Sequence, residues 1–319
     1  MAHREKQPQR TVLTVGGNAL VRPGEEGSIQ EQWQRALKLA LFISEMPADE
    51  QLVLTHGNGP QVGRILLRSD LCSAEVPEVP IDVAVAATQG QMGMMLQQAI
   101  ESIANRPTVT ILTQVLVETS DPEFKEPNKF IGRFYTQEEA ELKSANFGWV
   151  VKEDPGRGWR RVVASPQPHQ ILEKDAIHTL LRQGFTVIAC GGGGVPVIQH
   201  GEHLVGVEAV VDKDRSSALL AHLVKANRLI CLTGVDEVMV DFGTPQARPI
   251  HRASLMEMQT HLEDGQFPEG SMGPKIRSAL QFLRVGGDEV VITSPERLGD
   301  ALNGGVGTHI YAKGSHQDL

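Results

Sequence analysis

Residues 51–61 have the sequence QLVLTHGNGPQ. The first five, Gln51 to Thr55, form a short apolar run with β-branched residues, which is typical of a buried parallel strand. The turn that follows, His56 to Gln61, contains two glycines and an asparagine. Because ligands of open parallel sheets bind beyond the carboxyl ends of the strands, this stretch predicts both a strand and a binding turn.

Five more runs of the same kind recur along the chain: Thr11 to Val15, Thr108 to Leu112, Thr186 to Cys190, Leu229 to Thr233, and Glu289 to Thr293. Stretches with helical spacing separate them: Gln30 to Ser44, Ala84 to Ile103, Ile171 to Arg182, Ser216 to Val224, and Ile276 to Val285. Strands that alternate with helices imply βαβ crossovers. We therefore expect an α/β protein, a three-layer αβα sandwich with a mainly parallel central sheet, as one domain over residues 1–319.

The alternation stops between about residues 118 and 168. Charged residues and prolines gather there with six aromatics: Phe130, Phe134, Tyr135, Phe147, Trp149 and Trp159. A long disordered loop is the alternative, but loops of this length are uncommon in compact domains, and the aromatics favour a small core. We interpret this region as an inserted subdomain that protrudes over the sheet edge.

Composition narrows the function classes. The net charge of −9 disfavours a broad basic surface for nucleic acid, so a phosphate ligand would need a local cationic pocket. Cys72, Cys190 and Cys231 are far apart in the sequence, and we expect buried thiols of a protein in a reducing compartment. The polar first ten residues do not resemble a signal peptide, and no run reaches transmembrane length. These features predict a cytoplasmic protein without a membrane partner.

Four glycine-rich turns follow or precede the predicted elements: Gly16-Gly17-Asn18, Gly57-Asn58-Gly59, Gly191 to Gly194, and Gly270 to Lys275. Such turns present bare backbone N–H groups, and a helix that starts there favours anions. One glycine pair alone is more often structural, but several at strand exits indicate a phosphate site. The P-loop motif is absent and the spacing misses the dinucleotide fingerprint, so P-loop enzymes and Rossmann dehydrogenases are disfavoured.

Positive charge for that site is expected from Lys213, Lys275 and Lys129. A lysine at a helix start opposes the helix dipole, which is reasonable beside a phosphate, although a solvated surface charge is the alternative for any single lysine. Asp214 either orients these cations or caps the next helix; the spacing leaves both open. Phosphoryl transfer needs positive charge and hydrogen-bond donors, usually with Mg²⁺, and an anionic acceptor needs no general base.

At this point the motifs resemble those of carbamate kinases, which are members of the amino acid kinase superfamily. The matching segments are Gly16 to Leu20, His56 to Gly63, Gln89-Gly90 with Gly93, Lys129 to Gly132 with Tyr135, Ser165 to Pro168, Gly191 to Pro196, Glu208 to Asp214, and Gly270 to Lys275. They cover essentially the whole chain, and HGNGPQVG, GGGGVPV and GSMGPK in this order are very specific together.

The resemblance implies the amino acid kinase fold and a homodimer. It also implies reversible phosphoryl transfer between ATP and carbamate, giving ADP and carbamoyl phosphate, in the direction of ATP synthesis during arginine, agmatine or ureide catabolism. Mg²⁺ would come with the nucleotide rather than at a protein metal site. By resemblance, the acceptor and phosphate cradle is Gly16, Gly17, Asn18, Gly57, Asn58 and Gly59. The catalytic residues are Lys129, Lys213 and Lys275, with Asp214 holding the lysines. The nucleotide would be bordered by Thr233, Gly234, Val235, Asp236, Val238, Met272 and Gly273.

Three positions depart from the pattern of that family: Arg133, Phe134 and Gly234. A kinase of another small carboxylic acid or N-acyl amino acid is therefore one alternative, and Arg133 is the candidate partner for a bulkier acceptor's carboxylate. A catalytically silent nucleotide-binding relative is another alternative. The presence of all three lysines and Asp214 speaks against it.

Overall fold

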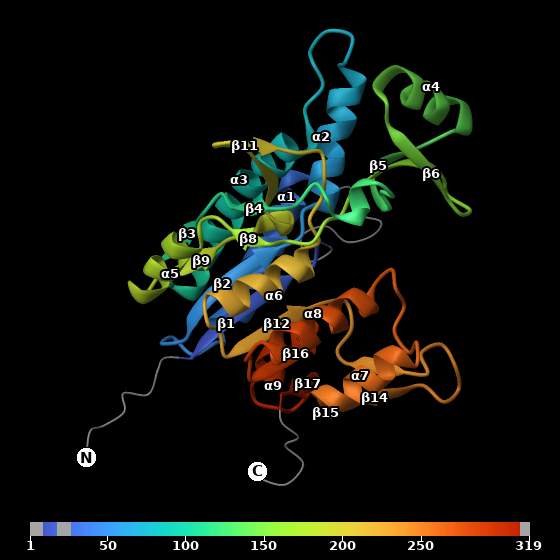
Figure 1. Cartoon of the computed structure of the whole chain (residues 1–319). Helices are drawn as coiled ribbons and strands as arrows, with labels where there is room; N and C mark the ends of the chain where they lie inside the picture. Colours follow the sequence, from blue (N-terminus) through green and yellow to red (C-terminus); the bar gives the residue numbers. More distant parts are fainter. Residues whose placement is uncertain (1–8, 18–26, 313–319) are drawn as a thin grey trace, which may run out of the picture.

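The computed structural model describes residues 9–17 and 27–312. Eight strands form the central sheet in the order β15-β17-β16-β12-β1-β2-β9-β3 (Figure 1). Their bounds are β1 Arg10–Val15, β2 Gln51–His56, β3 Thr108–Thr110, β9 Thr186–Ile188, β12 Arg228–Leu232, β15 Arg252–Ser254, β16 Glu289–Thr293 and β17 Thr308–Tyr311. Neighbouring strands run parallel except β16 and β17. The expectation of a mainly parallel sheet is confirmed.

Successive side chains of each strand enter different cores, because they point to opposite faces of the sheet. Val12 and Val53 belong to one hydrophobic cluster, while Leu13 and Leu54 belong to another. The first cluster is covered by α5 (Lys174–Arg182), α6 (Lys213–Leu223), α7 (Leu255–Glu263) and α8 (Met272–Arg284). The second is covered by α1 (Ile29–Ser44), α3 (Ile81–Ala99) and α9 (Leu298–Leu302). The predicted three-layer αβα sandwich is therefore confirmed.

A second sheet lies beside α3 and has the order β11-β10-β4-β8. Its strands are β4 Gln114–Leu116, β8 Gln170–Ile171, β10 Val195–His200 and β11 His203–Gly206. Helix α2 (Gly59–Leu71) shares a third hydrophobic cluster with α3 and with β5 (Lys129–Tyr135) through Val62, Val85 and Ile131. The short hairpin of β13 (Val238–Val240) and β14 (Arg248–Ile250) precedes β15.

Residues 129–163 form a unit that we call the subdomain. Strands β5, β7 (Gly158–Val163) and β6 (Val150–Asp154) pair antiparallel in that order, and α4 (Gln137–Phe147) connects β5 to β6. The Trp149 ring packs edge-on to Tyr135, with 6.2 Å between ring centroids, and 5.8 Å from the Phe147 ring. The wider boundary expected at about residues 118 and 168 stays a prediction.

The two helices that carry site lysines begin earlier than the sequence pattern indicated. Helix α6 starts at Lys213 instead of Ser216, and α8 starts at Met272 instead of Ile276. Each therefore includes a site lysine in its first turn.

The expectation for Cys72 was wrong: its thiol is exposed after α2, whereas Cys190 and Cys231 are buried in the core. Among the described residues, none of the helices has the length and apolarity to cross a membrane.

Candidate active site

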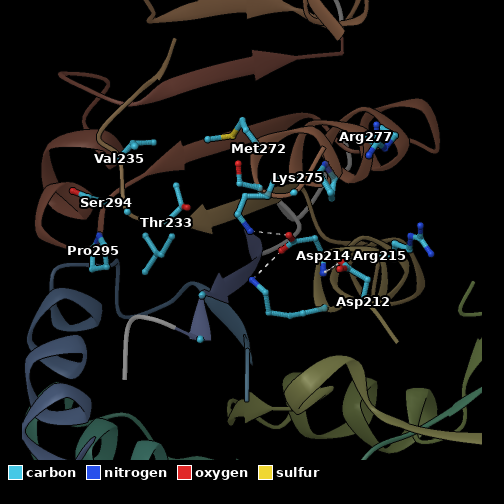
Figure 2. Close-up of a pocket in the computed structure, with 18 of the residues that line it drawn as sticks. Asp212, Asp214, Arg215, Thr233, Val235, Met272, Lys275, Arg277, Ser294 and Pro295 are labelled. Atoms are coloured by element: carbon cyan, nitrogen blue, oxygen red, sulfur yellow. Dashed lines mark hydrogen bonds and ion pairs between the residues drawn. The ribbon is translucent and has the colours of Figure 1, made fainter. Parts of the chain in front are cut away.

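The carboxyl ends of β1, β12 and β16 open into one cavity. Gly16, Thr233 and Ser294 follow these strands directly and line it. The cavity has a volume of about 1150 Å³, which exceeds the usual range for a small-molecule site and leaves room for a nucleotide together with an acceptor. Figure 2 shows its lining, with the strand-end loops on one side and the first turns of α6 and α8 on the other. The site thus lies where an open parallel sheet is expected to bind ligands.

The first two glycine turns touch each other. The amide of Gly57 donates to the Val15 carbonyl at 2.9 Å, and a Cβ built on Gly57 would lie 2.6 Å from the Gly17 nitrogen. Any side chain at Gly57 would therefore separate the turns. Gly16 and Gly17 line the cavity, whereas Asn18 lies outside the described residues.

Asn58 of the second turn packs against the run Gly191 to Gly194. The Asn58 side chain is buried and its Nδ2 donates to Thr88 Oγ1 at 2.8 Å. A Cβ on Gly192, whose φ is +67°, would collide with that amide. The four-glycine run therefore lets the backbone pack against Asn58. Gly57, Asn58 and Gly59 are not among the residues that line the cavity, so their assignment to the cradle stays a prediction.

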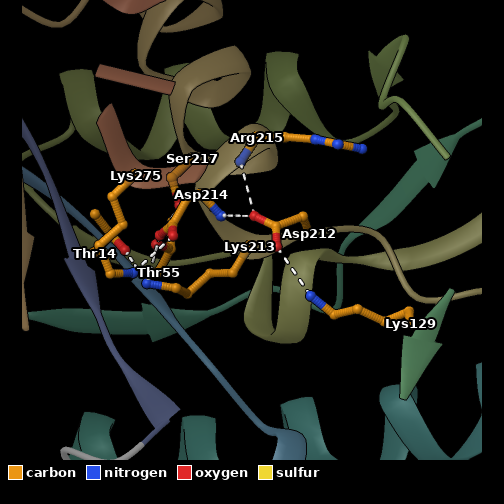
Figure 3. A network of polar contacts seen from close by, with 9 residues as sticks. All are labelled: Thr14, Thr55, Lys129, Asp212, Lys213, Asp214, Arg215, Ser217 and Lys275. Atoms are coloured by element: carbon orange, nitrogen blue, oxygen red, sulfur yellow. Dashed lines mark hydrogen bonds and ion pairs between the residues drawn. The ribbon is translucent and has the colours of Figure 1, made fainter. Parts of the chain in front are cut away.

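Asp214 joins two of the predicted lysines (Figure 3). Its Oδ1 lies 2.9 Å from Lys213 Nζ, and its Oδ2 accepts a 2.7 Å hydrogen bond from Lys275 Nζ. These three side chains are 9%, 13% and 16% exposed, so the charges are largely removed from bulk water. Lys213 Nζ also donates to Thr14 Oγ1 at 2.6 Å. One carboxylate thus holds two ammonium groups at the edge of the cavity.

The structure decides between the two hypotheses for Asp214. Asp212 is the residue that caps α6: its Oδ1 accepts from the Asp214 amide at 2.9 Å. Its other oxygen, Oδ2, accepts from Lys129 Nζ at 3.1 Å, which ties the subdomain strand β5 to the site. Asp214 orients the lysines and is not the cap. Sequence reasoning missed Asp212, although an aspartate directly before a helix is a recognisable cap signal.

The charges shift the protonation equilibria of these groups. Burial raises the pKa of the Asp214 carboxyl, but Lys213 and Lys275 outweigh it and bring that pKa well below its usual range. Burial lowers the pKa of Lys275, and Asp214 overcomes this and raises it. Burial also favours the neutral form of Asp212, yet Lys129 brings its pKa down. All three groups are therefore charged at neutral pH.

Residues from the loops after β12 and β16 line another part of the cavity. Thr233, Gly234, Val235 and Met272 line it, and their contact with the nucleotide stays a prediction. Ser294 and Pro295, which follow β16 and were not predicted, line it too (Figure 2). A Cβ at Gly234 would have no atom within 4 Å, so packing does not require glycine there.

Three predicted nucleotide residues are not among the residues that line the cavity. Val238 is buried in the first hydrophobic cluster, the one that contains Val12, and Asp236 is exposed in the loop before Val238. The Gly273 amide donates to the Pro268 carbonyl at 2.9 Å. Their nucleotide contacts stay predictions. Arg277, which was not predicted, lines the mouth and is paired with Glu269 through both guanidinium nitrogens.

Comparison with known proteins identifies the family. The model of the amino acid kinase family matches residues 9–294. The chain belongs to the amino acid kinase family. A carbamate kinase from Thermococcus kodakarensis is 42% identical over 311 residues, which are 95% of this chain and 99% of that protein. The carbamate kinase-like protein YahI of Escherichia coli is 44% identical over 309 residues, 94% of this chain and 98% of that protein.

A solved structure of this family agrees with the fold. Carbamate kinase from Giardia lamblia bound to AMP-PNP superposes with a TM-score of 0.90 at 39% identity, over 96% of this chain and 99% of that chain. The likeness extends over nearly the whole length of both chains. The superposition therefore includes nearly all of the central sheet, its helical layers and the segments that line the cavity.

The arrangement suits a polyanion in this amino acid kinase family member. Three ammonium groups and the Gly16-Gly17 turn line one end of the cavity, where phosphate oxygens would find both charge and N–H donors. Among residues 9–17 and 27–312, no group of three or more His, Cys, Asp or Glu side chains could hold a metal ion. The chemistry that this site supports is phosphoryl transfer.

Proposed function

We propose that this protein is a carbamate kinase that transfers a phosphoryl group reversibly between ATP and carbamate, giving ADP and carbamoyl phosphate. The observation that most supports this is the Asp214 carboxylate between Lys213 and Lys275 at the strand-end cavity. Full-length relatives that are about 42% identical and named carbamate kinase point to the same activity. The charged side chains at the cavity and the named relatives both support an enzyme that uses ATP as phosphate donor.

Charge stabilisation would be the main catalytic contribution. In phosphoryl transfer, charge spreads over the equatorial oxygens of the moving group, and donors that are already in place stabilise it without reorganisation. We assign that role to Lys213 and Lys275, which Asp214 holds in position, and to Lys129 from the opposite side. Carbamate attacks through an oxygen that is already anionic, so the protein needs no general base.

Magnesium is proposed to arrive with the nucleotide. Mg²⁺ commonly binds through substrate phosphates and waters with few protein carboxylates. The carboxylates of Asp212 and Asp214 at the cavity each form ion pairs with lysines. They therefore fit an ion that is bound mainly by the nucleotide phosphates better than an ion held by protein carboxylates alone. When bound, the ion neutralises charge on the polyphosphate.

The acceptor is proposed to be small. Arg133, the candidate partner for a larger acceptor's carboxylate, does not line the main cavity. Its guanidinium lies 3.4 Å from Asp70 and 4.3 Å from the centroid of the Tyr135 ring. That position disfavours an amino acid acceptor bound by Arg133.

We also propose a homodimer in the cytoplasm. The exposed side chains of Met94 on α3 and of Leu112 line one surface depression together with glutamine side chains, and we propose this face as the contact between protomers. All three cysteines are free thiols, which suits a reducing compartment. Light scattering during gel filtration measures the assembly: a mass of twice 34.7 kDa is expected, and a monomer would refute the dimer.

The activity test is ATP formation from ADP and carbamoyl phosphate with Mg²⁺, followed by luciferase light. A control without enzyme corrects for the spontaneous breakdown of carbamoyl phosphate. Acetyl phosphate and an N-acylglutamyl phosphate serve as competing donors in parallel reactions. Rapid ATP formation from carbamoyl phosphate alone is expected. Preference for another donor, or nucleotide binding without ATP formation, would refute the proposal.

A further inference from the structure

Strand β5 joins the site to a second polar cluster. Lys129 pairs with Val163 of β7, and the regular register ends after Ile131, so that a bulge separates it from the Tyr135 pair. Gly132 within the bulge has a φ of +69°, a conformation that favours glycine. Bulges change the direction of side chains, and here Arg133 contacts α2.

The α2 residue that Arg133 meets is Asp70. Both Arg133 Nε and Nη2 lie 3.4 Å from Asp70 Oδ2. The other carboxylate oxygen accepts from Lys143 Nζ of α4, whose ammonium also lies 4.6 Å from the centroid of the Phe147 ring. Asp70 is only 8% exposed. We call Asp70, Arg133 and Lys143 the α2 latch, because one buried carboxylate of α2 binds two cations of the subdomain.

The latch connects two parts of the site through one helix. Helix α2 (Figure 1) begins at Gly59, the last residue of the second glycine turn, and ends at Leu71, directly after Asp70. Thirteen residues make a helix of roughly 20 Å, which transmits position as a rigid rod. The orientation of the subdomain is therefore coupled to the second glycine turn, which packs through Gly57 against Gly17 at the cavity wall.

Lys129 depends on this coupling more than the other lysines do. Its side chain is 40% exposed, against 13% for Lys213 and 16% for Lys275. Its ammonium contacts Asp212, while its backbone belongs to the subdomain. The path of β5 across α2 therefore determines where this ammonium lies.

We infer that Asp70 is a positioning residue for phosphoryl transfer: through Arg133 and Lys143 it holds β5, and with it Lys129, over the phosphate site. The inference rests on the proposed function. A purely structural latch would stabilise the subdomain without acting through Lys129, and kinetics can separate the two roles.

The test is a double-mutant cycle on the full chain, measured as kcat/KM for carbamoyl phosphate. Asp70→Asn is expected to lower this value about tenfold, since a displacement of a catalytic group by less than 1 Å has effects of this order. In a Lys129→Ala background the same substitution should cost less than about twofold, because the group through which it acts is gone. The Kd for ADP, measured by calorimetry, should change less than about threefold in every variant.

Asp154→Asn is the matched control. Asp154 is also a subdomain aspartate, and its ion pairs, with Arg157 and Arg160 at 3.8 and 3.7 Å, stay within the subdomain. Its variant should keep the wild-type kcat/KM within about twofold.

Two results would overturn the inference: a wild-type kcat/KM in Asp70→Asn, or an equal loss in both backgrounds. If Asp70→Asn fails to fold, Arg133→Gln at a 38% exposed side chain cuts the same latch and enters the same cycle. The wild-type protein is assayed first, before any variant is compared. If it forms no ATP from ADP and carbamoyl phosphate, the proposed function itself is refuted.

Discussion

Replacing Asp214 by asparagine should weaken both the fold and the reaction. The carboxylate lies 2.9 Å from Lys213 Nζ and 2.7 Å from Lys275 Nζ. An amide of the same size has one acceptor oxygen, and its NH₂ group cannot accept, so one of the two ammonium groups loses its partner. Removing one partner of a buried ion pair costs about 3–5 kcal/mol. Because the cavity admits water on one side, we expect the lower end, about 3 kcal/mol of unfolding free energy.

The kinetic loss should be at least as large. Without the carboxylate, the two lysines repel each other and leave their positions, so the site loses prepositioned donors to the transferred group. Removal of one such donor costs about 3 kcal/mol, or roughly a hundredfold in kcat. We therefore expect kcat/KM for ATP formation from ADP and carbamoyl phosphate to fall at least about a hundredfold in Asp214→Asn.

Urea unfolding and the luciferase assay measure these two quantities on the same preparation. Asp264→Asn is the control, because Asp264 is exposed at the end of α7 and undergoes the same chemical change. It should keep wild-type activity and stability. A kcat/KM within about threefold of wild type in Asp214→Asn would refute the role given to this carboxylate. Lost activity with unchanged unfolding free energy would refute the energetic argument alone.

Three further outcomes are expected. Lys213→Ala should lose roughly a hundredfold or more in kcat, and an unimpaired variant would remove Lys213 from the site. Gly57→Ala should abolish ATP formation, because its Cβ would lie 2.6 Å from the Gly17 nitrogen. Gly63→Ala is the control and should keep activity, since a Cβ there meets no atom within 4 Å. Equal activities of the two variants would contradict the packing of the first two glycine turns. Burial lowers the pKa of His56 to about 4, so the folded protein binds fewer protons than the unfolded chain between that value and about 6.5. The contribution of His56 to the unfolding free energy should be fully present above pH 6.5 and fall by about 3 kcal/mol toward pH 4. Urea unfolding at several pH values measures this, and the unfolding free energy of His56→Gln should depend less on pH over this range. The same pH dependence in both proteins would refute the lowered pKa of His56.

Much of the fold could be predicted because its signals are local. The run Gln51 to Thr55 and the turn after it became β2 and the start of α2, since apolar periodicity and glycine act over a few residues. Helix starts were less predictable. Lys213 belongs to the first turn of α6 because Asp212 caps it, and a cap competes with the apolar pattern that begins later.

The sequence pointed to the charged residues of the candidate site, but not to the uncharged residues that contact them or line the cavity beside them. Lys129, Lys213 and Lys275 were recognisable from the motifs around them. The hydroxyl of Thr14 that accepts from Lys213 was not, because a threonine inside a buried strand looks like any other β-branched residue. The same holds for Ser294, whose place at the cavity depends on the strand order of the sheet.

By itself, the sequence determined the α/β class, the glycine turns at the strand ends and the resemblance to carbamate kinases, because each depends on neighbouring residues. Only the tertiary structure decided which charges meet. Lys129 and Asp212 are 83 residues apart, and Arg133 and Asp70 are 63 apart. Such pairs form only after the strand order and the β5 bulge have brought distant segments together, and no local pattern specifies that encounter.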